Sequence, residues 1–381
     1  MNKSLQKKLN QVGLKVPDVL FPREGIDLTK FSCIAADQYT QDLAYWKRIK
    51  YFIGGAPSAY NLIYPEAEYI ARPNNLQKRI SSISNTMNEY ISNSTYEDIG
   101  PCFIFVERTS SSQHRRGLLV AIDLEQYDYN EGAKTLIRAT EKTVKDRLTI
   151  RRMIREEACL DLPHVLVLIN DKDDKLFKRI ESIKSESPLS TLYDFDLMEN
   201  SGHIKGYKIS NEKDIESLTD ILIELKEKSE DNFLYAIGDG NHSLAAAKDV
   251  YEKTGRGRYA LVELVNTFDG GIKFFPIHRL IIRVNRERFI NDTSIDPDNP
   301  PPLQELQSRL DKFNYNIDYI HGKKECIELG KKEGNISITY DNFSIDTLFS
   351  DVIKYGALCR KSFSLGEAQD KRFYLEAQII S

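Results

Sequence analysis

The stretch that decides the fold runs from Leu234 to Glu252 and reads LYAIGDGNHSLAAAKDVYE. An apolar strand predicted over 232–237 ends at a turn that holds Gly238 and Gly240, and an alanine-rich helix follows from about His242. The first backbone N–H groups of a helix have no partner inside the helix and lie at the positive end of its dipole. We therefore expect phosphate oxygens to be held by the N–H groups of Asn241, His242, Ser243 and Leu244.

Two side chains of this turn carry chemistry. Asp239 can ligate a metal ion, and together with His242 it forms a candidate acid–base pair. The alternative interpretation is a tight strand-to-helix turn in which Asp or Asn caps the helix, and the spacing alone leaves both interpretations open. The loop matches neither G-x-G-x-x-G nor the Walker A sequence, so it does not by itself identify a nucleotide.

The elements around this turn predict an α/β fold. A helix over 215–228 precedes the strand, and a further strand over 259–265 follows the second helix. The 381 residues include 41% hydrophobic side chains, enough for a large core, and the length favours two closely packed parts. Because prolines and short polar residues fill 291–302, we expect a main α/β domain over 1–290 and a small C-terminal α+β part over 303–381 packed on it.

Other segments of the main part have recognisable patterns. CFIFVERT and GLLVAIDL, over 102–109 and 117–124, predict a hairpin whose basic tip should be exposed. The apolar run over 162–169 is typical of a strand buried on both faces. Residues 75–91 have the apolar spacing of an amphipathic helix. A strand predicted over 31–36 ends at a polar turn that contains Asp37.

Composition excludes several classes of protein. A net charge of −4, from 53 basic and 57 acidic side chains, does not steer the molecule toward nucleic acid or anionic lipid, so any anion site must be local. The five cysteines lie far apart without a C-x-x-C pair, and the six histidines are dispersed, so neither disulfides nor a structural metal site is indicated. Since no signal-peptide pattern and no run of ~20 apolar residues is present, we expect a cytoplasmic protein.

Basic side chains supply the candidates for substrate binding. Arginine's planar fork binds phosphate or carboxylate with two hydrogen bonds, but the basic stretch over 136–155 is also typical of a solvated helix face with i,i+4 ion pairs. A histidine and an arginine follow the apolar strand Phe274–Ile277, and the segment 360–368 is basic close to the chain end. Their alternatives are a structural histidine and a surface loop. The candidates are Arg115, Arg116, Arg138, Arg147, His278, Arg279 and Lys361.

Several segments in combination resemble the bacterial domain-of-unknown-function family 1015. They lie within about residues 105–376 and read HRRGLLVAIDLEQYDY, IRATEKTVKDR, IREEACLDLPHVLVLIND, AIGDGNHSLAAAK, FFPIHRL, DYIHG and RKSFSLGEAQDKRFYLEA. The combination is highly specific to this family, which is itself poorly characterised.

The turn is also similar to the D-G-H-x-R turn of the ParB and sulfiredoxin-like superfamily, which includes archaeal ADP-dependent free serine kinases. There the turn opens a helix that holds the nucleotide phosphates. Asp239, Gly240 and His242 match it, whereas Asn241 is inserted before the histidine and Ser243 stands where a basic residue is common. The resemblance implies a ParB/sulfiredoxin-like core, ADP or ATP as co-substrate, and a link to serine metabolism.

The first hypothesis is a phosphotransferase that moves a phosphoryl group between serine or phosphoserine and an adenine nucleotide. Mg²⁺ held by Asp239 would bridge the phosphates, His242 would polarise the transferred group, and Asp37 or Glu141 would act as the base. Gly238, Gly240, Asn241 and Ser243 would contact the nucleotide. Positioning and charge stabilisation supply most of the catalysis in such enzymes.

Two rival hypotheses come from other classes. One is a phosphatase that hydrolyses phosphoserine without a nucleotide acceptor. The other is a nucleotide- or DNA-binding regulator without catalysis, although the near-neutral charge argues against extensive nucleic-acid contact. The expected partners are therefore a small phosphorylated substrate and a nucleotide, without a membrane, and the pattern leaves homo-oligomer formation open.

Overall fold

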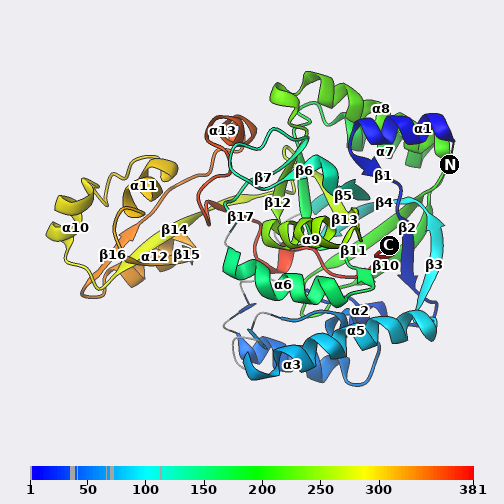
Figure 1. Cartoon of the computed structure of the whole chain (residues 1–381), viewed down its shortest axis with the longest axis horizontal. Coiled ribbons are helices and arrows are strands. Elements are labelled where there is room, and N and C mark those ends of the chain that lie inside the picture. Colours follow the sequence, from blue (N-terminus) through cyan, green and yellow to red (C-terminus); the bar gives the residue numbers. More distant parts are fainter. Residues whose placement is uncertain are drawn as a thin grey trace.

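The computed structural model describes residues 2–34, 39–40, 42–65, 67–68, 73–111, 114–143 and 145–381, and gives only the backbone for residues 73 and 145–147. The protein is a mixed α/β structure built on one large mixed sheet (Figure 1). Within these residues, no helix is both long enough and apolar enough to cross a membrane.

The large sheet consists of the following strands in spatial order: β10 (Ser190–Asp196), β11 (His203–Ile209), β4 (Phe103–Thr109), β5 (His114–Asp123), β13 (Tyr259–Asn266), β9 (Leu166–Ile169), β12 (Tyr235–Asp239), β7 (Ile137–Ala139) and β6 (Tyr127–Asp128), with β1 (Leu14–Lys15) paired to β5. Most neighbouring strands are antiparallel, whereas β13 and β9, β12 and β7, and β6 and β7 run parallel.

The buried strand expected within 162–169 is confirmed as β9. Its side chains alternate between two cores, since Val167 packs in the core on one face and Leu166 and Leu168 pack in a core on the other. It lies between β13 and β12, so both of its edges are paired. This central position explains why the whole run is apolar.

The hairpin of β4 and β5 is also confirmed, but the basic end that we expected to be exposed is so only at His114, whereas Arg115 is buried and Arg116 is partly buried. Arg115 is 3% exposed because it turns inward to an ion pair with Glu263 on β13. The predicted strand over 31–36 is wrong at its start, where helix α2 (Leu28–Phe31) ends. Cys33 makes one isolated pairing with Tyr374, and Asp37 lies outside the described residues.

Helices cover both faces of the large sheet (Figure 1). The predicted strand-turn-helix is present as β12 followed by α9, and the predicted helices over 75–91 and 215–228 are α5 and α8. One core contains side chains of α1 (Lys3–Gln11), α7 (Lys175–Glu186), α8 (Glu212–Lys228) and α9 (Asn241–Thr254). The opposite core contains those of α3 (Leu43–Ile53), α5 (Leu76–Ser92), β2 (Asp18–Pro22) and β3 (Tyr96–Pro101), and α6 (Lys145–Glu157) packs against α9 and α5.

A smaller sheet projects from one side of the large one (Figure 1). Its central strand, β14, precedes the proline-rich stretch, and its helices enclose a separate core around Phe289 and Leu306. The elements are β14 (Phe274–Ile282), β15 (Asn316–His321), β16 (Asn335–Ile338), β17 (Phe363–Leu365), α10 (Arg286–Thr293), α11 (Leu303–Leu310) and α12 (Lys323–Gly330). The chain then returns through α13 (Leu348–Tyr355) to the main body, where β18 (Gln378–Ile379) pairs with β8 (Leu160–Asp161).

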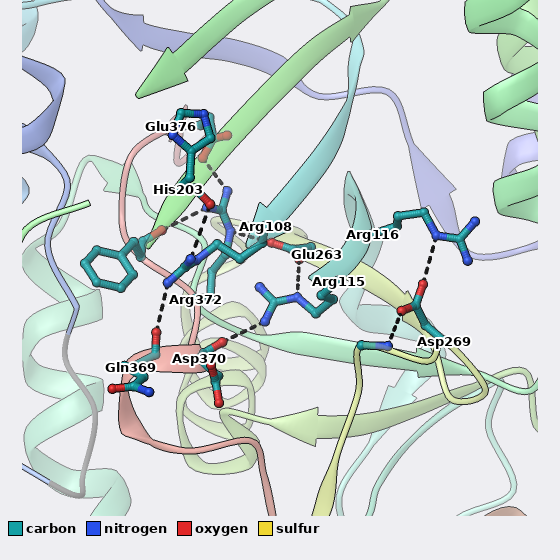
Figure 2. A network of polar contacts seen from close by, with 12 residues as sticks. Arg108, Arg115, Arg116, His203, Glu263, Asp269, Gln369, Asp370, Arg372 and Glu376 are labelled. Carbon is teal, nitrogen blue, oxygen red and sulfur yellow. Dashed lines mark hydrogen bonds and ion pairs between the residues drawn. The ribbon is translucent and has the colours of Figure 1, made fainter. Parts of the chain in front are cut away.

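A buried ion network fastens this returning segment to the large sheet (Figure 2). Glu263, which is fully buried, faces Arg372 Nε at 2.8 Å and accepts a hydrogen bond from Arg115 Nε at 3.1 Å. Arg372 also pairs with Glu376, and Arg115 donates to the carbonyl oxygen of Asp370 at 2.7 Å. Two of these contacts, Glu263 with Arg372 and Arg115 with Asp370, join the large sheet to residues 370–376, so the position of this segment is fixed from within the core.

Replacing Glu263 by glutamine should destabilise the protein by about 3–5 kcal/mol, because it leaves two buried guanidinium groups without their shared carboxylate. The free energy of unfolding from urea titration measures the loss. A matched control is Glu305→Gln, which breaks a surface pair with Arg309 and should cost less than about 1 kcal/mol. Equal losses in the two variants would show that the buried network does not hold the segment.

His278 on β14 should make stability depend on pH. Burial lowers its pKa to about 4, and its Nδ1 accepts a hydrogen bond from the amide of Tyr340 at 3.4 Å. Between pH 6.5 and 4 the unfolded chain therefore binds a proton there that the folded protein does not, so the free energy of unfolding falls as pH falls.

The variant His278→Gln should lose less stability than the wild type over this range, as measured by urea titration at several pH values. His203→Gln is the control. Hydrogen bonds to Asp196 and Asp194 raise the pKa of His203, so the folded protein binds this proton more tightly than the unfolded chain does, and His203 is not a cause of the loss of stability as pH falls. The same slope in His278→Gln and the wild type would contradict the assignment.

Candidate functional site

A cleft lies where the turn after β12 meets the returning C-terminal segment and the small sheet. We call it the phosphate cleft because the sequence predicts phosphate binding at this turn. It is lined by the turn 238–243, by Thr140 and Glu141 after β7, by Arg151 on α6 and by His164 before β9. The small sheet and the C-terminal segment supply its opposite wall. Segments far apart in the sequence therefore form the site together.

The two glycines of the turn are required by the neighbouring strand. Gly240 has φ +85°, and a Cβ atom there would lie 2.9 Å from Cγ2 of Val165. A Cβ atom on Gly238 would lie 2.8 Å from Cγ of Leu168. Because the turn packs this closely against β9 and the residue before it, Asp239 between the glycines is held at the edge of the cleft, where its side chain is 35% exposed.

Some of the backbone N–H groups at the start of α9 form hydrogen bonds within the protein. The amides of Ser243 and Leu244 both donate to the carbonyl oxygen of Gly240 at 3.0 Å, so they close the first helical turn. The side chain of Asn241 accepts a hydrogen bond from the amide of Thr140 at 3.1 Å. This contact ties the end of β7 to the turn and so places Glu141, the next residue, in the cleft.

Positive charge gathers in the cleft although the whole chain is slightly acidic. Arg151, Lys361 and Lys371 come from three separate segments and all line it. Lys371 Nζ lies 3.4 Å from Oδ2 of Asp239, across the cleft from the turn. The following residue, Arg372, also reaches the wall, but its charge is balanced by Glu263 and Glu376.

Three histidines line the cleft: His164, His242 and His321. Burial lowers the pKa of His164 to about 4, so it is neutral at neutral pH. Its ring centroid lies 5.1 Å from that of Tyr374, and its Nδ1 is buried with no hydrogen-bond partner among the described residues. A neutral imidazole there can exchange hydrogen bonds with a ligand without adding charge.

The structure brings part of the predicted set together. Of the residues proposed from the sequence, those that line the cleft are Glu141, Gly238, Asp239, Gly240, Asn241, His242, Ser243 and Lys361. Asp37 and the side chain of Arg147 lie outside the described residues.

Three predicted arginines lie elsewhere and contact protein groups. Arg115 belongs to the buried network with Glu263. Arg116 pairs with Asp269 at 2.9 Å and with Asp174 at 3.0 Å. Arg138 donates to the carbonyl oxygens of Thr135 and Asp231 at 2.8 and 2.6 Å, and its guanidinium lies over the ring of Phe233. None of the three lines the cleft in the described part of the chain.

His278 and Arg279 on β14 support the cleft from outside. The guanidinium of Arg279 is fully buried and donates to the carbonyl oxygens of Ile277, Arg360 and Lys361 at 2.6, 2.9 and 2.7 Å. It therefore holds the loop that carries Lys361 into the cleft. His278 accepts a hydrogen bond from the amide of Tyr340, which lies just after β16.

Sequence reasoning missed several residues of the cleft: Thr140, Arg151, His164, His321, Ser364, Lys371 and Arg372. Arg151 stood in the basic stretch over 136–155 without a signal that set it apart from its neighbours. For Lys371 a usable signal was present, since a Lys-Arg pair stands directly before the apolar residues Phe373, Tyr374 and Leu375. Charged residues beside such a run are placed at the boundary of a core.

Comparison with known proteins gives distant structural likenesses. A conserved hypothetical protein from Pyrococcus furiosus aligns with 68% of this chain and 95% of its own, at 12% identity and a TM-score of 0.37. A variant of free serine kinase in complex with ADP aligns over 71% of this chain and 95% of its own, at 11% identity and a TM-score of 0.40. Scores this low do not establish a common fold. No curated protein matches the sequence.

The family resemblance seen in the sequence is confirmed. The family described as "Protein of unknown function (DUF1015)" matches residues 20–324, which include the turn after β12, Glu141, Arg151 and both sheets' central strands. The match covers most of the chain, and the chain therefore belongs to the DUF1015 family.

Proposed function

We propose that the phosphate cleft is the active site of a phosphotransferase that moves a phosphoryl group between serine or phosphoserine and an adenine nucleotide. One observation carries the proposal: Arg151, Lys361 and Lys371 converge with the start of α9 on the same cleft as the carboxylates of Asp239 and Glu141. The similarity of the turn to that of the free serine kinases supports the choice of serine and of the nucleotide.

The arrangement suits a phosphorylated ligand. Cations and a helix N-terminus attract phosphate oxygens, and their effect is strongest in a site partly shielded from water. Lys371 now contacts Asp239, and a bound phosphate would offer this ammonium group a second anionic partner. Arg279 holds the backbone carbonyl oxygen of Lys361, so the loop that carries this cation is positioned before a ligand binds.

The side chains of the cleft also fit Mg²⁺. In the described part of the chain, no group of three or more His, Cys, Asp or Glu side chains is arranged to hold a metal ion. Mg²⁺ is commonly held by one or two carboxylates together with substrate phosphates, and Asp239 can supply such a carboxylate. When bound, the ion neutralises charge on the phosphoryl oxygens during transfer.

The chain's own groups would act on the reacting atoms as follows. In the direction of serine formation, a β-phosphate oxygen of ADP attacks the phosphorus of phosphoserine, the bond from phosphorus to the serine oxygen breaks, and that oxygen takes a proton. Lys361 and Lys371 hold the transferred group, and His242 polarises it. Glu141 supplies the proton, and in the reverse direction takes it from the serine hydroxyl. Asp37 stays an alternative base.

We also propose two features of the fold, the type of its core and the division of the chain into two parts. We propose a ParB/sulfiredoxin-like core, on the match of Asp239, Gly240 and His242 to the turn of that superfamily. We also propose that residues 1–290 are a main α/β domain and that residues 303–381 are a C-terminal α+β subdomain packed on it, on the proline-rich stretch between them.

Asp239→Asn should lower turnover at least about 100-fold, because it removes the carboxylate that we propose holds Mg²⁺. Serine release from phosphoserine and ATP formation from ADP, followed together with Mg²⁺ present, measure it. The melting temperature should stay unchanged, since Asp239 is partly exposed. The control Glu252→Gln lies on α9 outside the cleft and should keep wild-type activity.

Several outcomes of this assay decide between the hypotheses. ATP formed in step with serine supports the phosphotransferase, whereas serine without ATP identifies a phosphatase. Neither product, or full activity in Asp239→Asn, contradicts the proposal. A DNA mobility shift that weakens with salt would support the regulator instead.

Lys371→Met should raise KM for phosphoserine by about 10- to 100-fold, because a charge-assisted hydrogen bond to the phosphate is lost while the length of the side chain is kept. The matched control is Arg116→Gln, a cation that the sequence also favoured but that pairs with Asp269 and Asp174 away from the cleft. Steady-state kinetics with both variants distinguish the two placements. A larger effect from Arg116→Gln than from Lys371→Met would show that the substrate binds elsewhere.

A further inference from the structure

We propose that a second, apolar cavity beside the phosphate cleft binds the base of a purine nucleotide; this deepens the proposed function and rests on it for the position of the phosphates. The cavity lies between α5, α6, α9 and the segment 160–165. It shares Arg151, His164 and Ser243 with the phosphate cleft, so the two spaces adjoin at the start of α9.

The size and walls of the cavity suit a flat ring system. Its volume is about 200 Å³, and an engineered apolar cavity of about 150 Å³ is known to bind benzene. The apolar side chains that line it include Ile63, Met87, Ile154, Leu162, Ala247 and Leu261. The rings of Tyr374 and His164 complete the wall on the side toward the cleft. Apolar and aromatic surfaces of this kind favour the faces of a heteroaromatic base.

One polar group in the cavity wall favours a heteroaromatic base over a hydrocarbon chain as the ligand. Arg155 and Asp161 form an ion pair in the cavity wall, and Asp161 Oδ2 is held by the amide of Leu261 at 2.8 Å and by Gln378 Nε2 at 3.0 Å. Nη2 of Arg155 is buried and has no hydrogen-bond partner among the described residues. A buried donor without an acceptor costs free energy, and a hydrocarbon ligand would leave it in that state.

A purine can satisfy this donor. Its ring nitrogens, and O6 in guanine, are acceptors that lie in the plane of the base, and arginine is a common partner for such edges. With the phosphates at the start of α9, the nucleoside would enter the adjoining cavity past Arg151 and His164. The combination of an apolar slot, a buried donor and an adjacent cationic cleft therefore matches a purine nucleotide as one ligand.

Isothermal titration calorimetry of the full chain with ADP, GDP, CDP and pyrophosphate, all with Mg²⁺, tests the inference. A purine diphosphate should bind at least about 10-fold more tightly than pyrophosphate, because only the nucleotide fills the cavity. Ile154→Trp, which fills the cavity from α6, should remove this difference and leave pyrophosphate affinity within about twofold. Met153→Trp is the matched control, since Met153 lines a surface groove on the same helix, and it should bind ADP as the wild type does.

The inference is overturned if the wild type binds purine nucleotides no more tightly than pyrophosphate or CDP, or if folded Ile154→Trp binds ADP normally. Should that variant not fold, photolabelling of the wild type with 2-azido-ADP decides. Label on peptides from α6, α9 or 160–165 supports the inference, and label elsewhere overturns it. Purine-selective binding without phosphoryl transfer would remove the proposed function alone and leave a nucleotide-binding cavity.

Discussion

The buried carboxylate of Glu263 is the constraint on which the rest of the structure depends. It lies in the middle of the large sheet and meets two arginines, Arg115 from the neighbouring strand and Arg372 from the C-terminal segment. Separating charges in a low-dielectric interior is costly, so this geometry permits little displacement. The C-terminal segment is therefore fixed where Lys371, one residue before Arg372, faces Asp239 across the cleft.

Arg279, another buried arginine, fixes the position of a second cation of the cleft. Arg279 holds the loop at 360–361 through backbone carbonyls and so places Lys361. Lys361 and Lys371, which line the cleft, are thus positioned by the buried side chains of Arg279 and Arg372. The cleft forms only when the large sheet, the small sheet and the returning C-terminal segment are all in place. Folding therefore brings its positively charged side chains together.

Much of the fold could be predicted from the sequence because it follows local patterns. The consecutive buried side chains of β9, the periodic buried side chains of α5 and the glycine turn before α9 are each set by residues close together in the sequence. The sequence candidates that line the cleft are the residues of that turn with Glu141 and Lys361. The arginines were not predicted correctly, since an arginine has the same appearance whether it binds a substrate or a carbonyl group. Arg115, Arg116 and Arg138 face internal partners, and Lys371 reaches the cleft through pairing far along the chain. Such long-range contacts leave no periodic signal in the sequence.

We propose that the residues positioned by these internal contacts form one phosphate-binding cleft. A crystal structure of the full chain with ADP, Mg²⁺ and phosphoserine tests this directly. We expect phosphate oxygens between the start of α9 and the ammonium groups of Lys361 and Lys371, with Asp239 beside the metal ion. Phosphates bound at Arg115, Arg116 or Arg138, or at any surface away from the turn after β12, would contradict it.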